Sequence, residues 1–384
     1  EASAKRRATF EKRGQLLPAD RLHRLLDPGM PFLRLHTLAN FAVDNPDREA
    51  SIPGASVMVG IGFVGGVRCM IWVDDSGIAA GSATTKTGEV HLSLQEICKR
   101  QKLPLIHCVE SAGANLLQYQ TELWSVFGGV FRNLAQMSAM GLPTMVVLHG
   151  GSTAGGAYMP GMSDYVIGVK ENGMAALGGA ALVKAATGEV ANDRELGGTE
   201  MHASVSGVVE YLVEDDAHGL LKAREVFERL DWNRRATPIP RRAYQPPKYP
   251  AEQLAGAVPT DPKVPYDCRE VLARVVDGSE IEEFKPRYGA LTLCAHASIT
   301  GIACAVIGNN GPIDPNGATK VAQFIQACDQ ADLPIIFFQN TTGYMVGTEY
   351  EQAGMIKHGS KMIQAVSTTR VPKISLYIGA SFGA

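Results

Sequence analysis

Short runs of apolar residues alternate along the chain with longer segments in which apolar residues recur at helical spacing. The short runs predict buried strands at residues 67–73, 105–109, 145–148, 302–307, 335–338 and 374–378. The helical spacing predicts helices at residues 21–26, 92–100, 126–140, 318–330 and 355–366. Strands and helices in this alternation are typical of an α/β protein whose parallel strands are joined by helical crossovers.

A stretch rich in proline separates two such regions. Residues 238–262 contain several prolines and show little periodicity, so they are predicted to form an extended linker. A chain of 384 residues also exceeds what one hydrophobic core usually holds. We therefore expect an N-terminal domain at residues 1–237 and a C-terminal domain at residues 263–384. The second domain is expected to be incomplete, because the sequence stops inside a small-residue loop.

The two regions share an order of features that indicates internal duplication. Each has a Leu-Pro step into an apolar run, at Pro104 and at Pro334, followed by a turn of small residues. Each continues through a helical pattern to a second proline, Pro143 or Pro372, then an apolar run and a glycine-rich loop. One match is easily a coincidence, but four features in the same order predict a duplicated α/β unit.

The glycine-rich loops are the segments where chemistry is expected. Residues 150–158 read GGSTAGGAY, and residues 379–384 read GASFGA. Small residues let backbone N–H groups approach an anion, so each loop suits an oxyanion hole that stabilises an enolate. Close packing of a helix on a sheet also uses glycine and is the alternative explanation for one loop alone. Two such loops fit a reaction between two carbonyl-containing partners.

Composition and charge narrow the function classes. A net charge of −3, without a basic block, gives no reason to expect a nucleic-acid partner. No apolar run reaches the ~18 residues of a membrane span, so no membrane contact is expected. Seven scattered cysteines predict reduced thiols in a cytosol-like compartment and no zinc site.

Several other chemistries fit the sequence poorly. No G-x-x-x-x-G-K-[ST] loop occurs, so P-loop chemistry is a poor fit. Residues 60–65 spell G-x-G-x-x-G, but they precede an apolar run instead of following one. They are interpreted as turns between strands, not as a dinucleotide site. His149 borders the first glycine-rich loop, and a structural role is favoured for it over catalysis.

Seven further segments carry a resemblance to a known family. They are residues 110–116 (ESAGANL), 155–158 (GGAY), 182–189 (LVKAATGE), 195–198 (ELGG), 309–311 (NNG), 339–347 (QNTTGYMVG) and 381–384 (SFGA). In this order, and over nearly the whole chain, they resemble the carboxyltransferase (β) subunits of biotin-dependent acyl-CoA carboxylases. The nearest branch is that of the 3-methylcrotonyl-CoA and geranyl-CoA carboxylases.

The resemblance implies two crotonase-like (ClpP/crotonase) domains with different ligands. Acyl-CoA would bind mainly to the N-terminal half, and carboxybiotin mainly to the C-terminal half of a neighbouring subunit. The amides of Gly155, Gly156 and Ala157 would hold the thioester oxygen, and those of Phe382, Gly383 and Ala384 the ureido oxygen of biotin. Further residues implied on the acyl-CoA side are Ala112, Gly113, Ala114, Gly178, Gly179 and Ala180. On the biotin side they are Gly311, Thr342, Gly343 and Tyr344.

The phosphates of CoA require cationic partners. Arg21, Lys86 and the basic segment at residues 5–13 are the candidates. A solvated basic face is the alternative interpretation of the same residues.

The reaction implied by the resemblance needs no side-chain base. Carboxybiotin releases CO₂, the freed biotin nitrogen takes the α- or γ-proton, and the enolate captures the CO₂. The chain has no biotin-attachment motif and no ATP-binding glycine loop, so a separate biotin carboxylase and biotin carrier α subunit is implied. Also implied are dimers within a hexamer, no metal in this chain, and a location in the bacterial cytoplasm or the mitochondrial matrix of a eukaryote.

One segment departs from the family pattern. Residues 178–181 read GGAA where the family usually has A-G-P-P or T-G-P, and residues 174–177 lack the aromatic residue expected in the methylcrotonyl type. One hypothesis is that these smaller residues leave a longer acyl pocket that accepts a geranyl-like chain. Neutral variation of the loop is the other.

Three functional alternatives stay open. A biotin-dependent decarboxylase or transcarboxylase subunit would run the same half-reaction in reverse. A crotonase-type hydratase or isomerase is disfavoured, because a glutamate base is expected beside its oxyanion loop and Tyr158, Met159 and Pro160 stand here. A non-catalytic acyl-CoA-binding scaffold subunit is disfavoured by the intact glycine loops in both halves.

Overall fold

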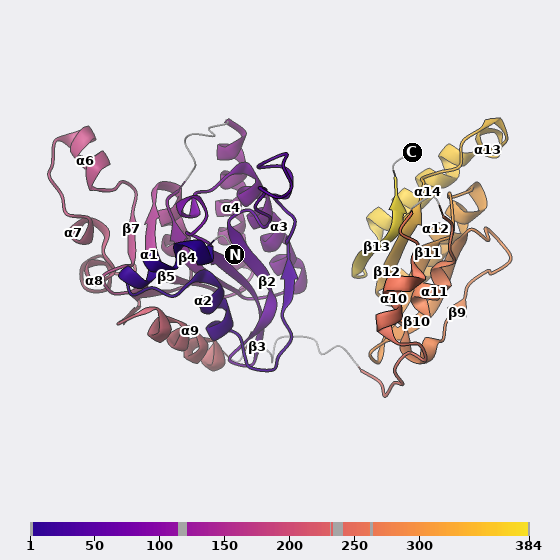
Figure 1. Cartoon of the computed structure of the whole chain (residues 1–384), viewed down its shortest axis with the longest axis horizontal. Helices are drawn as coiled ribbons and strands as arrows, with labels where there is room; N and C mark the ends of the chain where they lie inside the picture. Colours follow the sequence, from indigo (N-terminus) through magenta and orange to yellow (C-terminus); the bar gives the residue numbers. More distant parts are fainter. Residues whose placement is uncertain (1–2, 114–120, 231, 233–240, 262–263, 383–384) are drawn as a thin grey trace. The chain divides into compact units, whose positions relative to one another are not determined.

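The computed structural model describes residues 3–113, 121–230, 232, 241–261 and 264–382. The chain divides into two compact units, Glu1–Thr237 and Pro238–Ala384, and each is considered by itself. Both units combine one β-sheet with helices (Figure 1). The predicted α/β class is therefore confirmed.

The N-terminal unit is built on an eight-stranded mixed sheet. Its strands are β1 (Leu33–Leu35), β2 (Val57–Val64), β3 (Val67–Asp74), β4 (Leu105–Ser111), β5 (Thr144–Thr153), β6 (Tyr165–Val169), β7 (Met174–Ala176) and β8 (Tyr211–Val213). They lie in the order β1-β2-β3-β4-β5-β6-β8, with β7 paired to β5. The first three strands are antiparallel, and the pairs from β3 onwards are parallel.

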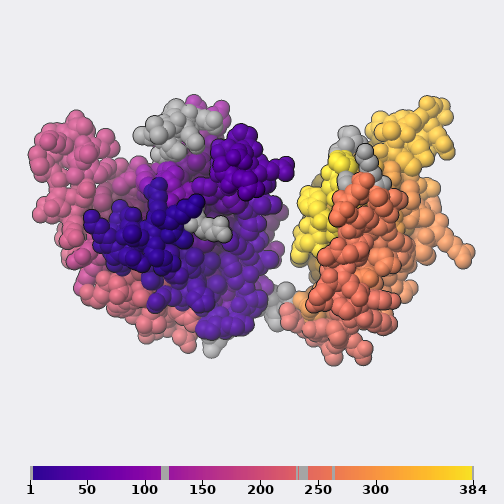
Figure 2. All heavy atoms as spheres, in the orientation of Figure 1, coloured from indigo at the N-terminus to yellow at the C-terminus, as the bar shows by residue number. Residues whose placement is uncertain are grey.

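Helices connect and cover these strands. They are α1 (Arg7–Lys12), α2 (Pro18–Leu25), α3 (Thr85–Gln101), α4 (Thr121–Ala139), α5 (Tyr158–Gly161), α6 (Ala180–Thr187), α7 (Asp193–Gly197), α8 (Thr199–Met201) and α9 (Asp216–Leu230). Helix α3 begins seven residues before the predicted helix, because Thr84 and Thr87 form a reciprocal capping box. The segment with α6 and α7 projects from the body of the unit (pink in Figures 1 and 2).

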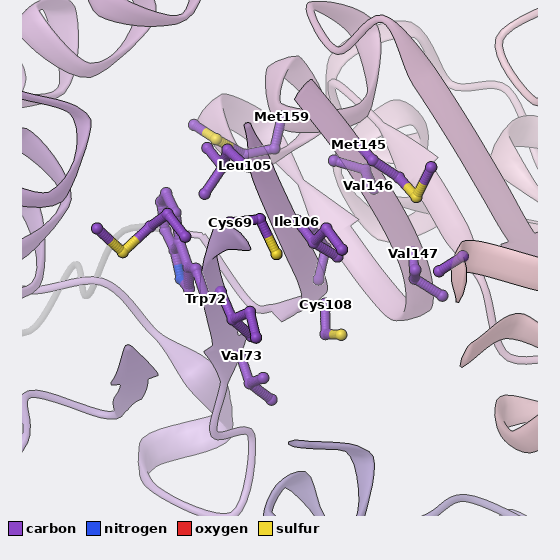
Figure 3. Close-up of a cluster of buried hydrophobic side chains, with 14 of the residues drawn as sticks. Cys69, Trp72, Val73, Leu105, Ile106, Cys108, Met145, Val146, Val147 and Met159 are labelled. Carbon is purple, nitrogen blue, oxygen red and sulfur yellow. The ribbon is translucent and has the colours of Figure 1, made fainter. Parts of the chain in front are cut away.

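The core of this unit lies around the central parallel strands. Trp72, Ile106 and Val146 come from β3, β4 and β5, and each is at most 1% exposed. Figure 3 shows them among the other buried side chains of these strands. Strands whose two faces are both covered read as continuous apolar runs, which is why the sequence pattern identified them.

The second unit has a five-stranded sheet in the order β13-β12-β11-β10-β9. Its strands are β9 (Glu282–Glu283), β10 (Thr292–Ile299), β11 (Ile302–Asn309), β12 (Ile335–Thr341) and β13 (Lys373–Ser381). Its helices are α10 (Leu254–Ala257), α11 (Cys268–Leu272), α12 (Pro315–Gln330), α13 (Thr348–Gln352) and α14 (Met355–Thr368). Helix α12 begins at Pro315 because the side chain of Asp314 accepts the amide of Gly317.

The same order of elements occurs in both units. The first has an antiparallel hairpin β2–β3, then α3, β4, α4 and β5, with β3, β4 and β5 parallel. The second has an antiparallel hairpin β10–β11, then α12, β12, α14 and β13, with β11, β12 and β13 parallel. In both units, therefore, the loops after the last two strands of this series emerge at the carboxyl edge of the sheet.

Every predicted strand and helix is present, but some boundaries differ. Residues 60–64 are part of strand β2, so the interpretation of residues 60–65 as turns was wrong. Only Gly65 and Gly66 turn the hairpin, both with positive φ. The glycines of this segment face close neighbours: a Cβ on Gly60 would lie 2.5 Å from the Phe32 ring. Glycine there serves packing, which sequence spacing does not distinguish from a turn.

Strands β5 and β13 run further than predicted. Residues 150–153 and 379–381 were expected to lie in loops, yet they still belong to these strands. The glycine-rich segments therefore begin inside the sheet, and only their last residues leave it.

The described part of the predicted linker, residues 241–261, contacts the second unit. The Arg242 amide donates to the Gly301 carbonyl at 2.8 Å, and Leu254 and Val258 pack against a buried cluster of that unit. Residues 241–250 form neither helix nor strand, because prolines interrupt the backbone hydrogen bonding.

The seven cysteines are free, and all of them are buried. Burial raises the pKa of the Cys108 thiol to about 12, which makes it a poor nucleophile. Among the described residues, no helix combines the length and the apolar composition that a membrane crossing requires.

Candidate active site

A bulge in the pairing of β4 with β5 creates the first glycine-rich loop. Val109 pairs with Leu148, but the next pair is Ser111 with Ser152. Glu110 alone therefore faces three residues of β5, namely His149, Gly150 and Gly151. Such a bulge bends a strand and redirects the residues that follow it, and bulges are frequent beside active sites.

The predicted oxyanion donors follow this bulge directly. After Thr153 the chain turns at Ala154, whose φ of 53° is in the left-handed region, into the 3₁₀ helix Ala154–Ala157. Gly155, Gly156 and Ala157 are partly exposed there. The first N–H groups of a helical turn have no partner within it. A Cβ on Gly156 would lie 3.0 Å from Ser152 Oγ, so a larger residue would push the turn outward.

The turn after β4 packs against the end of β5. The Ala83 amide donates to the Gly113 carbonyl at 2.8 Å, and the Ala112 amide donates to the Ala80 carbonyl at 3.1 Å. Gly113 has a φ of 81°, and a Cβ on it would lie 3.1 Å from the Thr153 carbonyl oxygen. Ala112 and Gly113 are thus beside the start of the oxyanion turn, while Ala114 lies outside the described residues.

Strand β7 brings a third predicted segment to the same place. Its residues Met174–Ala176 pair with residues 151–153 of β5. Gly178, Gly179 and Ala180 follow two residues later, where the Ala180 amide donates to Asp193 Oδ1 at 2.8 Å. Every residue of the adjoining helix α6 is at least partly exposed.

A cavity of about 370 Å³ lies at the carboxyl ends of β3, β4 and β5. It is lined by Arg6, Thr9, Phe10, Arg13, Gln15, Ser76, Ala80, Glu110, Ser111, Ala112, Gly151 and Thr153. Two arginines of the basic N-terminal segment thus share one cavity with the ends of β4 and β5. Figure 2 shows this segment, in indigo, at the surface of the unit.

Arg21 does not serve the role predicted for it. Its side chain is 0% exposed, with Nη1 at 2.6 Å from Glu110 Oε2 and Nε at 2.9 Å from Asp216 Oδ2. Both carboxylates hold the pKa of the guanidinium above its usual range in spite of burial. A CoA phosphate has no access to a group so enclosed, and the assignment of Arg21 to CoA was wrong.

Lys86 differs from Arg21 because it stays at the surface. It lies in the first turn of α3 with its side chain 39% exposed, and its Nζ is 2.6 Å from Glu89 Oε2. An exposed pair of this kind is weak and easily exchanged. A role for Lys86 in binding CoA stays a prediction.

His149 is part of the same buried cluster. Its Nδ1 lies 2.9 Å from Asp216 Oδ1, and its Nε2 is buried without a hydrogen-bond partner among the described residues. Burial and the charge of Arg21 lower the pKa of His149. Burial would raise the pKa of Asp216, but His149, Arg21 and the Leu16 amide outweigh it and lower the pKa to about 2. A neutral His149 donating to an ionised Asp216 fits the structural role predicted for it.

The lowered pKa of His149 makes stability depend on pH. The unfolded chain binds a proton near the ordinary value of 6.5, whereas the folded chain binds it only at lower pH. The free energy of unfolding is therefore expected to fall as pH drops below 6.5. Between pH 7 and pH 5 wild type should lose more stability than His149→Asn, which keeps a donor to Asp216.

Urea unfolding followed by tryptophan fluorescence measures this difference. Trp72, Trp124 and Trp232 are the three tryptophans of the chain, and all lie in the N-terminal unit. His23→Asn, at an exposed position of α2, is the matched control. Equal pH dependence in wild type and His149→Asn contradicts the prediction.

A second bulge occurs between β12 and β13. Gln339 pairs with Tyr377, but the next pair is Thr341 with Ser381. Asn340 therefore faces residues 378–380. The Phe382 amide donates to the Thr341 carbonyl at 3.2 Å, and the Phe382 side chain is 60% exposed. Gly383 and Ala384 lie outside the described residues.

The residues predicted to bind biotin meet at this edge. The Ile313 amide donates to the Gly343 carbonyl at 2.9 Å, and Ile313 forms a bridge with Tyr344. The segments that contain Gly311 and Thr342–Tyr344 thus lie together after β11 and β12. Burial raises the pKa of the Tyr344 hydroxyl, whose ring lies beside Gly359.

Sequence reasoning missed the side chains that support these loops. Glu110, Asp216 and Asn340 were given no role, although Glu110 directly follows the predicted strand at residues 105–109 and Asn340 comes two residues after the end of the one at 335–338. A polar residue at the end of a buried strand is a signal that the strand ends at a site. Asp216 carries no such signal.

Comparison with known proteins identifies the family. The carboxyl transferase domain family matches residues 10–384. A probable biotin-dependent acyl-coenzyme A carboxylase beta2 subunit from Mycobacterium tuberculosis is 45% identical over 377 residues, covering 97% of this chain and 69% of that protein. A 3-methylcrotonyl-coenzyme A carboxylase beta1 subunit from the same organism is 43% identical over 375 residues, covering 97% and 70%.

A solved structure agrees with these relatives. The β subunit of geranyl-CoA carboxylase from P. aeruginosa superimposes with a TM-score of 0.91 at 49% identity, covering 98% of this chain and 70% of that subunit. The resemblance noted in the sequence is thereby confirmed, including its methylcrotonyl-CoA and geranyl-CoA branch. This chain belongs to the carboxyl transferase domain family, among the carboxyltransferase (β) subunits of biotin-dependent acyl-CoA carboxylases.

Proposed function

We propose that this chain carboxylates an acyl- or enoyl-CoA thioester with the carboxyl group of carboxybiotin, using backbone amides at two bulged strand ends. The observation that carries this proposal is the pair of bulges, one before residues 155–157 and one before Phe382. The first bulge places a turn of small residues at the carboxyl end of parallel strands, and the second brings Phe382 to the corresponding strand end. Amides held in this way stabilise developing negative charge without reorganising during the reaction.

On the acyl-CoA side, the chain binds and polarises the thioester. Amides of Gly155–Ala157 would hold the carbonyl oxygen as it becomes an enolate. Ala112 and Gly113 pack beside this turn, and the cavity with Arg6 and Arg13 would accept the CoA portion. Gly178, Gly179 and Ala180 would line the acyl chain, and Lys86 is the remaining surface cation proposed for the phosphates.

On the other side, the residues of the second unit fit a bicyclic urea. The turns with Gly311 and Thr342–Tyr344 adjoin each other, and exposed Phe382 offers an apolar surface beside them. Amides around Phe382, Gly383 and Ala384 would hold the ureido oxygen. Carboxybiotin, when bound, supplies the carboxyl group and a nitrogen that accepts the substrate proton. The chain itself contributes orientation and exclusion of water, which supply much of such a rate enhancement.

The partner and the assembly are proposed from the family. Biotin would arrive on a biotin carboxylase and carrier α subunit, as the similarity to biotin-dependent β subunits suggests. The transcarboxylase 12S core, 27% identical with a TM-score of 0.53, is described as a hexamer. We propose dimers within a hexamer for this chain too, with acyl-CoA and biotin sites from neighbouring subunits.

The test is fixation of [¹⁴C]bicarbonate by the full-length protein with ATP and its α partner, compared with each subunit alone. Acid-stable label in an acyl-CoA only when both subunits are present supports the proposal. Decarboxylation of a carboxylated acyl-CoA without fixation would indicate a decarboxylase. Binding of acyl-CoA without either reaction would indicate a scaffold subunit.

The same assay measures which acyl chain the protein prefers as a substrate. Because residues 178–181 are small and α6 is exposed, geranyl-CoA is expected to be turned over at least as well as methylcrotonyl-CoA. A strong preference for methylcrotonyl-CoA would contradict the hypothesis of a longer acyl pocket. Neutral variation of the loop would then explain the small residues at 178–181.

A further inference from the structure

The two bulges share more than their position. In each, one residue of the first strand faces three residues of the next: Glu110 faces residues 149–151, and Asn340 faces residues 378–380. The second of the three is a glycine in both cases, Gly150 or Gly379. The residues proposed to hold an oxyanion follow within a few positions, from Gly155 in the first unit and from Phe382 in the second.

In both units the facing side chain fills the space beside that glycine. A Cβ on Gly150 would lie 2.5 Å from Cγ and 2.7 Å from Cδ of Glu110. A Cβ on Gly379 would overlap Oδ1 of Asn340. A polar side chain thus rests directly on the bulged backbone, and only glycine permits this approach.

The residue before the glycine is also held in both units. Gln15 Nε2 donates to the His149 carbonyl at 2.9 Å, and the Tyr266 hydroxyl donates to the Ile378 carbonyl. Both donors come from outside the sheet. The bulged peptide is therefore fixed from two directions, by the facing side chain and by a hydrogen-bond donor from another segment.

The two facing side chains, Glu110 and Asn340, differ in charge. Glu110 is 5% exposed, and its carboxylate accepts from Arg21 at 2.6 Å and from Gln15 at 3.2 Å. Asn340 is neutral, and its Oδ1 accepts the Ala380 amide at 3.2 Å. In the first unit, hydrogen bonds from Arg21 and Gln15 therefore hold the facing side chain against the bulge, whereas in the second unit the facing side chain accepts a hydrogen bond from the bulge itself.

We propose that Glu110 and Asn340 are matched positioning residues: Glu110 sets the turn proposed to hold the thioester oxygen, and Asn340 sets the strand end that leads to Phe382 on the proposed biotin side. This inference rests on the proposed function. Neither residue needs to touch a reacting atom, because each acts through the backbone of the adjacent bulge. A shift of about 1 Å in such a turn lowers a rate by about 100-fold.

A variant that displaces the turn proposed to hold the thioester oxygen should lose its preference for a ligand with a carbonyl group. A general folding defect should instead weaken the binding of every CoA ligand. Calorimetry compares binding of an acyl-CoA thioester with a thioether analogue that lacks the carbonyl oxygen. Gly150→Ala is expected to lower the thioester preference about tenfold and to leave thioether affinity within about twofold. Gly161→Ala is the matched control, because no described atom lies within 4 Å of a Cβ at that glycine.

A second set of variants tests the contact between the Glu110 side chain and Gly150. Glu110→Gln keeps the shape of the side chain and should retain most of the thioester preference, whereas Glu110→Ala should lose it. Adding Gly150→Ala to Glu110→Ala should cost less than about threefold further, because the two changes remove one interaction. Should Gly150→Ala fail to fold, Glu110→Gln and Glu110→Ala carry the comparison.

The second unit is expected to show a different defect. Asn340→Ala and Gly379→Ala should raise the KM for the biotinylated α partner or lower kcat by about tenfold, with an unchanged thioester preference. Gly256→Ala, at an open position of the same unit among the described atoms, is the control.

Two outcomes distinguish this inference from the proposed function. Absence of any thioester preference in the wild-type protein contradicts the proposed function. A wild-type preference that Gly150→Ala and Glu110→Ala leave intact overturns the positioning role and keeps the function.

Discussion

Replacement of Gly156 by valine is expected to lower the rate of carboxyl transfer by about 100- to 1,000-fold in a protein that remains folded. A Cβ at this position lies 3.0 Å from Ser152 Oγ, and valine adds two further methyl groups. Ser152 is buried in β5, so the strand cannot yield easily and the turn with residues 155–157 must move. Its amides then no longer point to the thioester oxygen.

The measurement is kcat for bicarbonate fixation with saturating α partner, after circular dichroism has confirmed the fold. Gly128→Val is the control, because this exposed helical glycine has no described atom within 4 Å of a built Cβ. Valine is also the better helix former of the two. Undiminished transfer by Gly156→Val would mean that backbone amides of this turn do not stabilise the enolate.

Replacement of Arg21 by methionine is expected to reduce the stability of the N-terminal unit by about 3–5 kcal/mol. Methionine fills a similar volume but leaves Glu110 and Asp216 buried without their cation. The cost comes from the unpaired charges, since an intact buried ion pair often contributes little net stability. Double replacement with Glu110→Gln should recover part of the loss.

Urea unfolding followed by tryptophan fluorescence isolates this effect, because the three tryptophans lie in the N-terminal unit. Arg24→Met, on the exposed side of the same helix, should change stability by less than about 0.5 kcal/mol. Equal stability of Arg21→Met and Arg24→Met would contradict the proposed cost of breaking the buried cluster.

Much of the architecture was readable from the amino-acid pattern. Strands such as β4 and β12 contain mainly apolar runs because helices or neighbouring segments cover them, and α12 (Pro315–Gln330) includes the helix predicted at residues 318–330. Glycine clusters marked where the backbone approaches a neighbour closely. They did not tell whether the neighbour is a ligand or another part of the chain, and residues 60–64 proved to be a packed strand.

The contacts that hold the site together could not be predicted from the sequence in the same way. A bulge is a property of two paired strands, so the partners of Glu110 and Asn340 follow from register and not from local spacing. Arg21 looked like a surface cation, because the carboxylates that enclose it lie 89 and 195 residues away in the chain.

Local pattern thus established the kind of elements, their order and the two segments of small residues, because burial on a helix or strand leaves a periodic record in the sequence. Folding alone selected which side chains meet beneath those segments. Ion pairs and bulges join residues distant in the chain, and the free energy of burying their charges depends on contacts that no local pattern records.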